Sequence, residues 1–457
     1  MTKKPSVGIL GGGITGLSVA YSLQKKDIEA VVYEKNHKAG GVIQSVKEEG
    51  WLFEKGPNTL QIRNQEMWDL LNDLQLGSEI RKAGGSARKR FIVKDGIPQP
   101  IPLSLPGFLK TPLFSPSAKL RLMREPFVPV SERSDESVAR FISRRLGREP
   151  LDYAVDPFVS GVYAGDPDKL SVKHTFSALW EMEQTYGSLL KGAFRRPRNK
   201  NRTSRTLVSF EGGMETLPLA LKQHLGEKVR CGTEVQKLTR IPDGWKVKVS
   251  SPEGVTELEH KVIVSTLPAH SLNKILNQEL QQEESCGISG IPYAPLSVIA
   301  LGFKREQVEH PLDGFGMLIP QAEGFRILGT LFSSTLFPNR TPENHVLLTS
   351  FIGGARYPEL AHMSTQELMT IAVQELSHLL GIRGTPVFTK HVYWKRAIPQ
   401  YETGYESYLD VMSQIETQQP GLLLAGSYRG GVSVPDCIMN GIETARRAEM
   451  FVSSSGN

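Results

Sequence analysis

The most constraining stretch of this chain is residues 7–34, which read VGILGGGITGLSVAYSLQKKDIEAVVYE. The apolar run at 7–10 predicts a short buried strand, and it leads directly into a G-x-G-x-x-G turn at residues 11–16. A helical pattern of apolar residues follows, and residues 30–33 predict a second strand that ends on Glu34. Strand, turn, helix and strand in this order are the context that the glycine pattern requires, so the stretch predicts a βαβ unit.

Each residue of this unit has a physical role in binding a dinucleotide. Gly11 permits the tight turn, Gly13 lets a pyrophosphate approach the N–H groups at the start of the helix, and Gly16 lets helix and strand pack closely. Glu34 stands where a carboxylate accepts hydrogen bonds from a ribose diol. The unit therefore predicts an adenine dinucleotide site. An ordinary glycine-rich turn is the alternative.

At 457 residues the chain is too long for one core, so we expect two or three domains. Hydrophobic residues make up 39% and charged residues 22%, as in an ordinary globular protein. Cys231, Cys286 and Cys437 are far apart and odd in number. They predict neither a disulfide framework nor a metal site, and they favour a reducing compartment.

The chain shows no signal peptide and no apolar run long enough to span a membrane, so we expect a cytoplasmic protein that is soluble or peripheral to the inner face of the membrane. The net charge is +6, and residues 194–205, FRRPRNKNRTSR, hold six basic residues and no acid. This stretch is either a solvated loop or a region attracted to an anionic membrane. Nucleic acid is not expected as a partner, because no groove-reading helix or interleaved aromatic residues accompany it.

Pieces of one α/β domain recur along the chain. Residues 206–210 and 262–265 predict strands, and residues 421–426 repeat the strand-then-turn pattern of the opening, followed by an amphipathic helix at 436–451. Between about 100 and 190 the composition changes to proline-rich, leucine-rich and then helical sequence. This interleaving favours a flavin-binding fold over a nicotinamide dehydrogenase, whose dinucleotide segment is usually contiguous.

Several motifs together resemble the protoporphyrinogen oxidase family, within the flavin amine oxidase-like proteins. They are FEKGPNTLQ, DPFVSGVYAGDPDKLSV from Asp156, FEGGMETLPLAL from Phe210, WKRAIPQYETGY from Trp394, and LAGSYRGGVSVPDCIMNGIE from Leu424. The resemblance covers essentially the whole chain. One departure is Gly404-Tyr405, where the family usually has Gly-His, so no histidine role is expected there.

The resemblance implies an α/β fold with a discontinuous Rossmann-like FAD domain, a mixed-sheet α+β substrate domain and an inserted helical membrane-facing domain. The implied boundaries are 1–85, 207–268 and 418–457 for the FAD domain, 86–103, 188–206 and 269–417 for the substrate domain, and 104–187 for the helical domain. The apolar residues Leu105, Phe108, Leu109, Leu113 and Phe114, flanked by Lys110 and Lys119, either dip into a membrane interface or pack in a core.

For FAD, the resemblance implies that the glycine-rich turn contacts the pyrophosphate and that Glu34 contacts the adenosine ribose. Two loops after the first βαβ unit and the segment at 432–434 would contact the flavin, and Val235 would lie near the adenine. The expected residues are Gly11, Gly12, Gly13, Ile14, Thr15, Gly16, Glu34, Lys35, Gly41, Val42, Gly56, Pro57, Asn58, Thr59, Val235, Val432, Ser433 and Val434. At Gly426-Ser427, where many flavoproteins of the wider class carry an acid, this chain has none. A backbone contact is the expected substitute.

For substrate, the resemblance implies Arg90 as a cation for a propionate, and Phe315, Gly316 and Leu318 as the lining of a flat macrocycle. Gly316 is expected to let the ring approach. Arg63 is a weaker candidate, for a propionate or for the reduced flavin, and Cys437 is expected to be a buried apolar residue. No residue is predicted as an obligatory acid or base.

The implied activity is the oxidation of protoporphyrinogen IX to protoporphyrin IX in haem biosynthesis. It would proceed by three hydride transfers to FAD, with O2 as acceptor and H2O2 as product. A coproporphyrinogen III oxidase of the same fold is the nearest alternative, followed by another flavin amine oxidase-like enzyme and by a non-catalytic flavin-binding subunit. The resemblance also suggests a homodimer and hand-off of product to a ferrochelatase.

Overall fold

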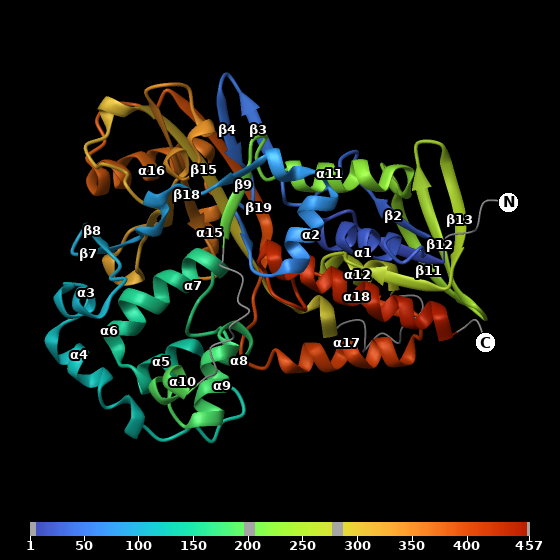
Figure 1. Cartoon of the computed structure of the whole chain (residues 1–457), viewed down its shortest axis with the longest axis horizontal. Helices are drawn as coiled ribbons and strands as arrows, with labels where there is room; N and C mark the ends of the chain where they lie inside the picture. Colours follow the sequence, from blue (N-terminus) through green and yellow to red (C-terminus); the bar gives the residue numbers. More distant parts are fainter. Residues whose placement is uncertain (1–5, 196–205, 277–286, 455–457) are drawn as a thin grey trace.

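A five-stranded parallel sheet, in the order β10-β2-β1-β14-β20, organises one half of the molecule in this computed structural model, which describes residues 6–195, 206–276 and 287–454 (Figure 1). Its strands are β1 (Val7–Leu10), β2 (Ala30–Glu34), β10 (Val229–Cys231), β14 (Val262–Ser265) and β20 (Leu422–Leu424). Most of these residues are apolar and buried, as expected for a parallel sheet covered on both faces. The predicted opening strand, helix and second strand are therefore confirmed.

Helices from distant parts of the chain cover this sheet. On one face, α1 (Ile14–Gln24), α2 (Gln65–Asp73), α11 (Thr216–Leu225) and α18 (Val434–Ser454) share a core with β1, β2 and β14. On the other face lie α12 (Ala269–Leu276), α17 (Glu406–Gln418) and the antiparallel strands β11 (Glu234–Ile241), β12 (Gly244–Ser251) and β13 (Gly254–His260). Two small sheets, β3–β4 and β5–β9–β6, join this half to the rest; their strands are β3 (Ser45–Glu48), β4 (Trp51–Glu54), β5 (Leu60–Ile62), β6 (Ile80–Lys82) and β9 (Thr206–Phe210).

A seven-stranded mixed sheet forms the second half, in the order β19-β15-β18-β17-β16-β7-β8. Its strands are β7 (Phe91–Lys94), β8 (Ile97–Pro100), β15 (Tyr293–Lys304), β16 (Gly316–Leu318), β17 (Ile327–Phe332), β18 (His345–Gly353) and β19 (Phe388–Pro399). The helix α16 (Thr365–Leu380) packs Leu368, Ile371 and Leu376 against it. A capping box between Ser364 and Glu367 starts this helix.

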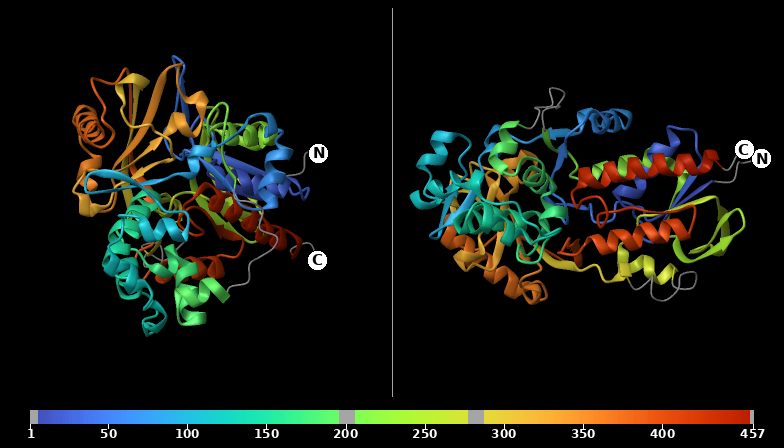
Figure 2. Two further views of the ribbon diagram at one scale, coloured as in Figure 1. Left: turned by 60° about the vertical axis from the view of Figure 1, so that its left-hand side comes forward. Right: turned by 90° about the horizontal axis from the view of Figure 1, so that it is seen from below.

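A helical unit lies beside the seven-stranded sheet, and both views of Figure 2 keep it at that end of the molecule. Its helices are α3 (Leu105–Lys110), α4 (Pro116–Leu122), α5 (Val138–Arg145), α6 (Arg148–Pro150), α7 (Asp156–Tyr163), α8 (Val172–Thr175), α9 (Ser177–Tyr186) and α10 (Leu189–Arg195). Its interior contains buried ion pairs between side chains. Arg145, which is fully buried, pairs with Glu125 at 3.1 Å and with Glu183 at 2.6 Å. Glu125 also accepts the N–H groups of Leu189 and Leu190, which fixes the start of α10.

Near three of the expected domain boundaries, 187, 268 and 417, the packing of the neighbouring helices can be described, and the boundaries themselves stay predictions. Helix α10 is bonded to Glu125, so the helical unit continues past 187. Helices α12 and α17 bury their apolar faces with β14 and β20, so both pack on the parallel sheet rather than on the seven-stranded one. An amphipathic helix packs on an apolar face that is within its reach, and composition alone does not identify which sheet provides that face.

The apolar residues for which both a membrane interface and a core were expected separate into two groups. Leu113 is only 1% exposed and packs inside, which is the second of these alternatives. Phe108 and Phe114 are half-buried against each other, with ring centroids 5.7 Å apart, whereas Leu105 and Leu109 are exposed. The basic stretch 194–205 lies mostly outside the described residues. Within the described residues, no helix is both long and apolar enough to cross a membrane.

Candidate functional site

The carboxyl ends of four parallel strands meet at one edge of the five-stranded sheet. The ladders align Leu10 with both Tyr33 and Ser265, and Ser265 with Leu424. The segments that follow these strands, from 11, 34, 266 and 425, must therefore lie side by side. In doubly wound sheets this edge is where ligands bind. The segments that begin at 11, 34 and 425 are far apart in the sequence, and each contains or leads into predicted cofactor residues.

The glycine-rich turn leaves an open cradle at this edge. Gly11 has a φ of +101°, and a Cβ on Gly16 would lie 2.1 Å from the carbonyl oxygen of Gly11, so both positions require glycine. A Cβ on Gly13, in contrast, would meet no atom within 4 Å. Gly13 is the residue before α1, whose first N–H groups favour an anion. The empty space at Gly13 fits the approach of a pyrophosphate.

Glu34 is buried and held in one orientation at the end of β2. Its Oε2 accepts the N–H of Gly12 at 2.8 Å, and its Oε1 accepts both the backbone N–H of Asn36 at 2.9 Å and the Asn36 amide at 2.7 Å. Thr233 donates its N–H to the Glu34 carbonyl, and Val235 follows two residues later. Lys35 lies beside Gly232 and Glu234 in a hollow of about 460 Å³. The predicted ribose and adenine-side residues therefore come together.

The flavin-side loops also converge on the turn. Gly40 donates its N–H to the carbonyl of Gly12 at 2.8 Å, which brings Gly41 and Val42 next to Gly13. A Cβ on Gly56 would lie 2.2 Å from the Val42 carbonyl oxygen, so the loop of Gly56, Pro57, Asn58 and Thr59 passes directly against Val42. Val42 keeps 46% of its surface exposed, which leaves an apolar side chain available to a ligand.

The start of α18 completes this region. Val432 and Ser433 precede the helix, Val434 is its first residue, and the Ser433 hydroxyl accepts the N–H of Asp436. Asp436 also pairs with Arg63 at 2.6 Å. This ion pair gives Arg63 a partner other than the propionate or flavin that the sequence suggested.

Cys437 lies one residue further along α18 and is buried. Burial raises the pKa of its thiol to about 12, while a contact from Thr15 lowers it in part, so the thiol is protonated at neutral pH. This agrees with the expected role as a buried apolar residue, since a thiol must ionise to be a good nucleophile.

The candidate substrate residues form a second cluster, on β7, β16 and the segments around them. The Arg90 guanidinium lies over the ring of Phe315 at 4.9 Å from its centroid, and it is exposed. Leu318 packs its side chain over Gly161 of α7 and Gly329 of β17. Leu318 therefore faces the junction of the seven-stranded sheet and the helical unit, whereas Phe315 packs with Ala87, Leu336 and Phe337 and carries Arg90 over its ring.

The backbone around Gly316 requires glycine, and the expected approach of a flat ring stays a prediction. Gly316 is buried with a φ of +147°, and a Cβ there would lie 2.3 Å from the carbonyl oxygen of Thr330. The residue is therefore glycine because β17 pairs tightly with β16, and no approach of a flat ring is needed to explain it.

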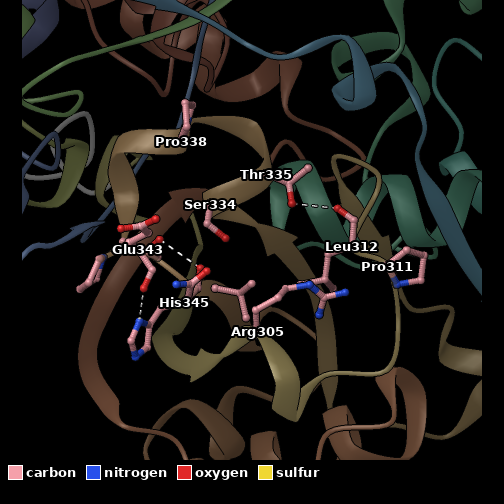
Figure 3. Close-up of a pocket in the computed structure, with 12 residues that line it drawn as sticks. Arg305, Pro311, Leu312, Ser334, Thr335, Pro338, Glu343 and His345 are labelled. Atoms are coloured by element: carbon pink, nitrogen blue, oxygen red, sulfur yellow. Dashed lines mark hydrogen bonds between the residues drawn. The ribbon is translucent and has the colours of Figure 1, made fainter.

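A hollow of about 300 Å³, drawn in Figure 3, lies elsewhere on the seven-stranded sheet. Arg305, Leu312, Thr335 and His345 line it, and none of the predicted cofactor or substrate residues does. The Arg305 side chain donates to the carbonyls of Val308 and His310, so its hydrogen bonds serve the local chain. We assign no chemistry to this hollow.

Sequence reasoning missed several residues that hold the site together. Asn36 orients Glu34, the Asn440 amide oxygen accepts the N–H of Gly426, and the hydroxyls of Tyr401 and Tyr405 reach the loop after β20. The contact of Asn440 lies within the protein, and the backbone contact of Gly426-Ser427 with the cofactor stays a prediction. The IPQY segment signalled Tyr401, but nothing in its sequence indicates a partner thirty residues away.

The fold and this edge define a class of protein. An FAD-dependent oxidoreductase has this architecture: a parallel sheet, a glycine-rich turn, a buried carboxylate such as Glu34 at the position that suits a ribose, and loops from distant parts of the chain. A sequence model described as flavin containing amine oxidoreductase matches residues 14–448, nearly the whole chain. The chain belongs to this flavin-containing amine oxidoreductase family, and FAD is its cofactor.

Individual proteins of known name are similar to this chain over nearly its full length. The chain is 35% identical to protoporphyrinogen oxidase 2 of Arabidopsis thaliana, over 99% of this chain and 95% of that one. It is 28% identical to coproporphyrinogen III oxidase of Bacillus subtilis, over 96% of each chain. A solved structure from Exiguobacterium sp. 255-15, provisionally named a protoporphyrinogen oxidase, has a TM-score of 0.81 and 23% identity, over 98% of this chain and 99% of that one.

The open space at Gly13 yields a prediction. Gly13→Ala should leave the fold intact, because its φ of −71° is allowed for alanine and the new methyl group meets no protein atom. It should weaken FAD binding by roughly tenfold, about 1.4 kcal/mol, because the methyl group occupies the approach of the pyrophosphate. Titration of apoprotein with FAD, followed by flavin fluorescence, measures this.

Gly77→Ala is the matched control, since a Cβ at Gly77 also meets no atom within 4 Å and Gly77 is not among the expected cofactor residues. Both variants should melt at the temperature of the parent protein. An unchanged dissociation constant for FAD in Gly13→Ala would contradict the assignment of this cradle.

Proposed function

We propose that this protein oxidises protoporphyrinogen IX to protoporphyrin IX with O2 as the electron acceptor. The observation that carries the proposal is the 35% identity to a plant protoporphyrinogen oxidase over nearly the full length of both chains. A second plant relative, from Nicotiana tabacum mitochondria and of the same name, is 35% identical over 98% of this chain. Such coverage includes the cofactor edge and the candidate substrate cluster alike.

The proposed FAD contacts follow the converging strand ends. Gly11 to Gly16 would receive the pyrophosphate, Glu34 the adenosine ribose, and Val42, the loop at 56–59 and residues 432–434 the flavin end. When bound, FAD supplies the acceptor for a hydride. The chain's own task is to orient the substrate and exclude water, and we assign no side chain as acid or base.

Arg90 is the proposed anchor for a substrate propionate. Within the described part of the chain, no carboxylate forms an ion pair with Arg90, whereas neighbouring Lys89 is paired with Asp313 at 2.7 Å. The aromatic face of Phe315 holds the guanidinium in place without neutralising it. An oriented, unneutralised guanidinium is well suited to bidentate recognition of a carboxylate.

A coproporphyrinogen III oxidase is the second candidate, favoured by the full-length relatives of that name, such as the one from Bacillus subtilis. Coproporphyrinogen carries four propionates, so its site needs more cations than one. Around Phe315 the cation in ring contact is Arg90, which favours the substrate with fewer propionates.

The deciding assay offers the purified, FAD-loaded protein protoporphyrinogen IX, coproporphyrinogen III or a simple amine in air. We expect porphyrin fluorescence and H2O2 to rise fastest with protoporphyrinogen IX. Faster oxidation of coproporphyrinogen would reverse the assignment in favour of the second candidate. Porphyrin formation no faster than autoxidation with both porphyrinogens would reject the proposed function.

Replacing Arg90 tests the anchor. Arg90→Ala should raise KM about tenfold, or about 1.4 kcal/mol, and change kcat less than about twofold, because a propionate is remote from the reacting carbon. Steady-state kinetics with the preferred porphyrinogen measure both constants. Arg383→Ala removes another exposed positive charge, one in an ion pair with Glu309, and should change neither constant. Unchanged kinetics in Arg90→Ala would remove this residue from the site.

We further propose that the helical unit attaches to a membrane surface. Exposed apolar side chains gather on α3 and on the turn after α4, where Leu105 is 72%, Leu109 62% and Phe127 86% exposed. Lys110, Arg121 and Arg124 lie within the same stretch, a pairing of apolar and basic residues that suits an anionic lipid interface. A homodimer and hand-off of product to a ferrochelatase stay predictions.

Vesicle co-sedimentation tests the membrane proposal. The parent protein should bind vesicles of mixed neutral and anionic lipid, and the triple variant Leu105→Ser, Leu109→Ser, Phe127→Ser should bind at least about tenfold more weakly, because it loses apolar area at the interface. The control, Val255→Ser with Val387→Ser, removes exposed apolar side chains outside the helical unit and should bind like the parent. Equal binding by all three proteins would contradict the proposal.

A further inference from the structure

The loop that joins β20 to α18 is held by side chains from elsewhere in the fold. At its start, Gly426 donates its N–H to the Asn440 amide oxygen at 2.8 Å. At its centre, the Tyr405 hydroxyl donates to the Tyr428 carbonyl at 2.6 Å. Tyr401 makes two contacts: its hydroxyl donates to the Ser427 carbonyl and accepts the N–H of Gly431 at 2.9 Å. This loop leads directly into residues 432–434, the proposed flavin contacts.

The Tyr401 hydroxyl is well suited to bridge both ends of the loop. Its ring is 6% exposed and packs against Tyr405, with ring centroids 4.6 Å apart. Burial raises the pKa of the phenol, so it stays protonated and can donate one hydrogen bond while it accepts another. Without the hydroxyl, the Ser427 carbonyl and the Gly431 N–H would each lose this partner.

The backbone of this loop does not fix its conformation by itself, because it contains Gly431. Gly431 has a φ of +113°, and a Cβ there would lie 2.7 Å from the Cβ of Asp436, so this backbone conformation is available only to glycine. Glycine is also the residue that gains most entropy when it is released. The contact of Gly431 with Tyr401 therefore selects one conformation from many.

The backbone of Tyr401 is itself anchored to the helical unit. Ser171 donates its N–H to the Tyr401 carbonyl at 2.8 Å, and Thr403 donates its N–H to the Lys169 carbonyl at 2.8 Å. The Asp135 carboxylate accepts the N–H of Gly404 at 3.0 Å. The residue that holds the loop is thus fixed from its other side by residues 135–171.

We propose that Tyr401 is a positioning residue for the flavin. Its hydroxyl sets the conformation of residues 427–431 in the apoprotein and so presents residues 432–434 to FAD in a binding-competent arrangement. The inference concerns the cofactor alone and holds whichever porphyrinogen is the substrate. It also gives the IPQY segment a role in joining the helical unit to the cofactor region.

Tyr401→Phe tests the proposal, because it keeps the buried ring and removes only the hydroxyl. We expect the apoprotein to bind FAD roughly tenfold more weakly, as for the loss of two hydrogen bonds at one loop. We also expect the visible absorption bands of the bound flavin to shift, since its surroundings are less ordered. Tyr408→Phe is the control: its hydroxyl donates to the Gly290 carbonyl at 3.0 Å on the surface, and both readouts should stay at parental values.

A lower melting temperature in Tyr401→Phe with unchanged FAD affinity and unchanged flavin spectrum would show a merely structural role and overturn the proposal. Hydrogen exchange on the unmodified chain decides the matter even if this variant does not fold. The amides of Gly426, Arg429 and Gly431, which donate hydrogen bonds in this structure, should already be protected in the apoprotein. Free exchange in the apoprotein, with protection only after FAD is added, would mean that the flavin orders the loop, and it would also overturn the proposal.

Discussion

Strand β1 is held between β2 and β14 by parallel ladders on both sides, and the position of every loop in the cofactor region depends on this pairing. Because parallel strands end at the same edge, the ladders bring the glycine turn after β1 next to Glu34 and next to the segment after β14. The chain closes the edge with β20, which pairs with β14 more than 150 residues later in the sequence. A slip of the ladder between β1 and β2 would separate the glycine turn from Glu34, which are proposed to bind the pyrophosphate and the ribose.

Two parts of the cofactor edge are held in place by different means. The glycine turn, proposed to bind the pyrophosphate, is fixed by its own backbone contacts, whereas the loop proposed to lie near the flavin ring is held by side chains. Gly11 and Gly16 close the turn by contacts that tolerate no side chain, and Glu34 is oriented by three N–H donors. The loop after β20 has no such intrinsic constraint, and side chains from α17, α18 and the end of β19 hold it instead. Preorganised elements of this kind reduce the entropy that a bound cofactor would otherwise have to remove.

Ion pairs decide which charged groups remain available for ligands. Arg63 lies on the flavin side but is paired with Asp436, and Arg145 is enclosed by Glu125 and Glu183. Glu416 receives Arg429 and Arg447; burial by itself would raise its pKa, but these hydrogen bonds outweigh that effect and lower it. Arg90 differs from these residues because it is exposed over an aromatic ring, and this availability is the basis for proposing it as a propionate anchor.

The sequence by itself determined the opening βαβ unit, because this unit depends on the local spacing of apolar residues and glycines, and the resemblance of its motifs identified the family and the cofactor. It could not determine that Arg63 meets Asp436, that Leu113 packs inside while Leu105 stays exposed, or that Gly316 serves a strand pairing. Nor could it reveal that the hydroxyl of Tyr401 reaches Gly431. Those outcomes depend on contacts between segments far apart in the chain, and only the tertiary structure decides which segments become neighbours.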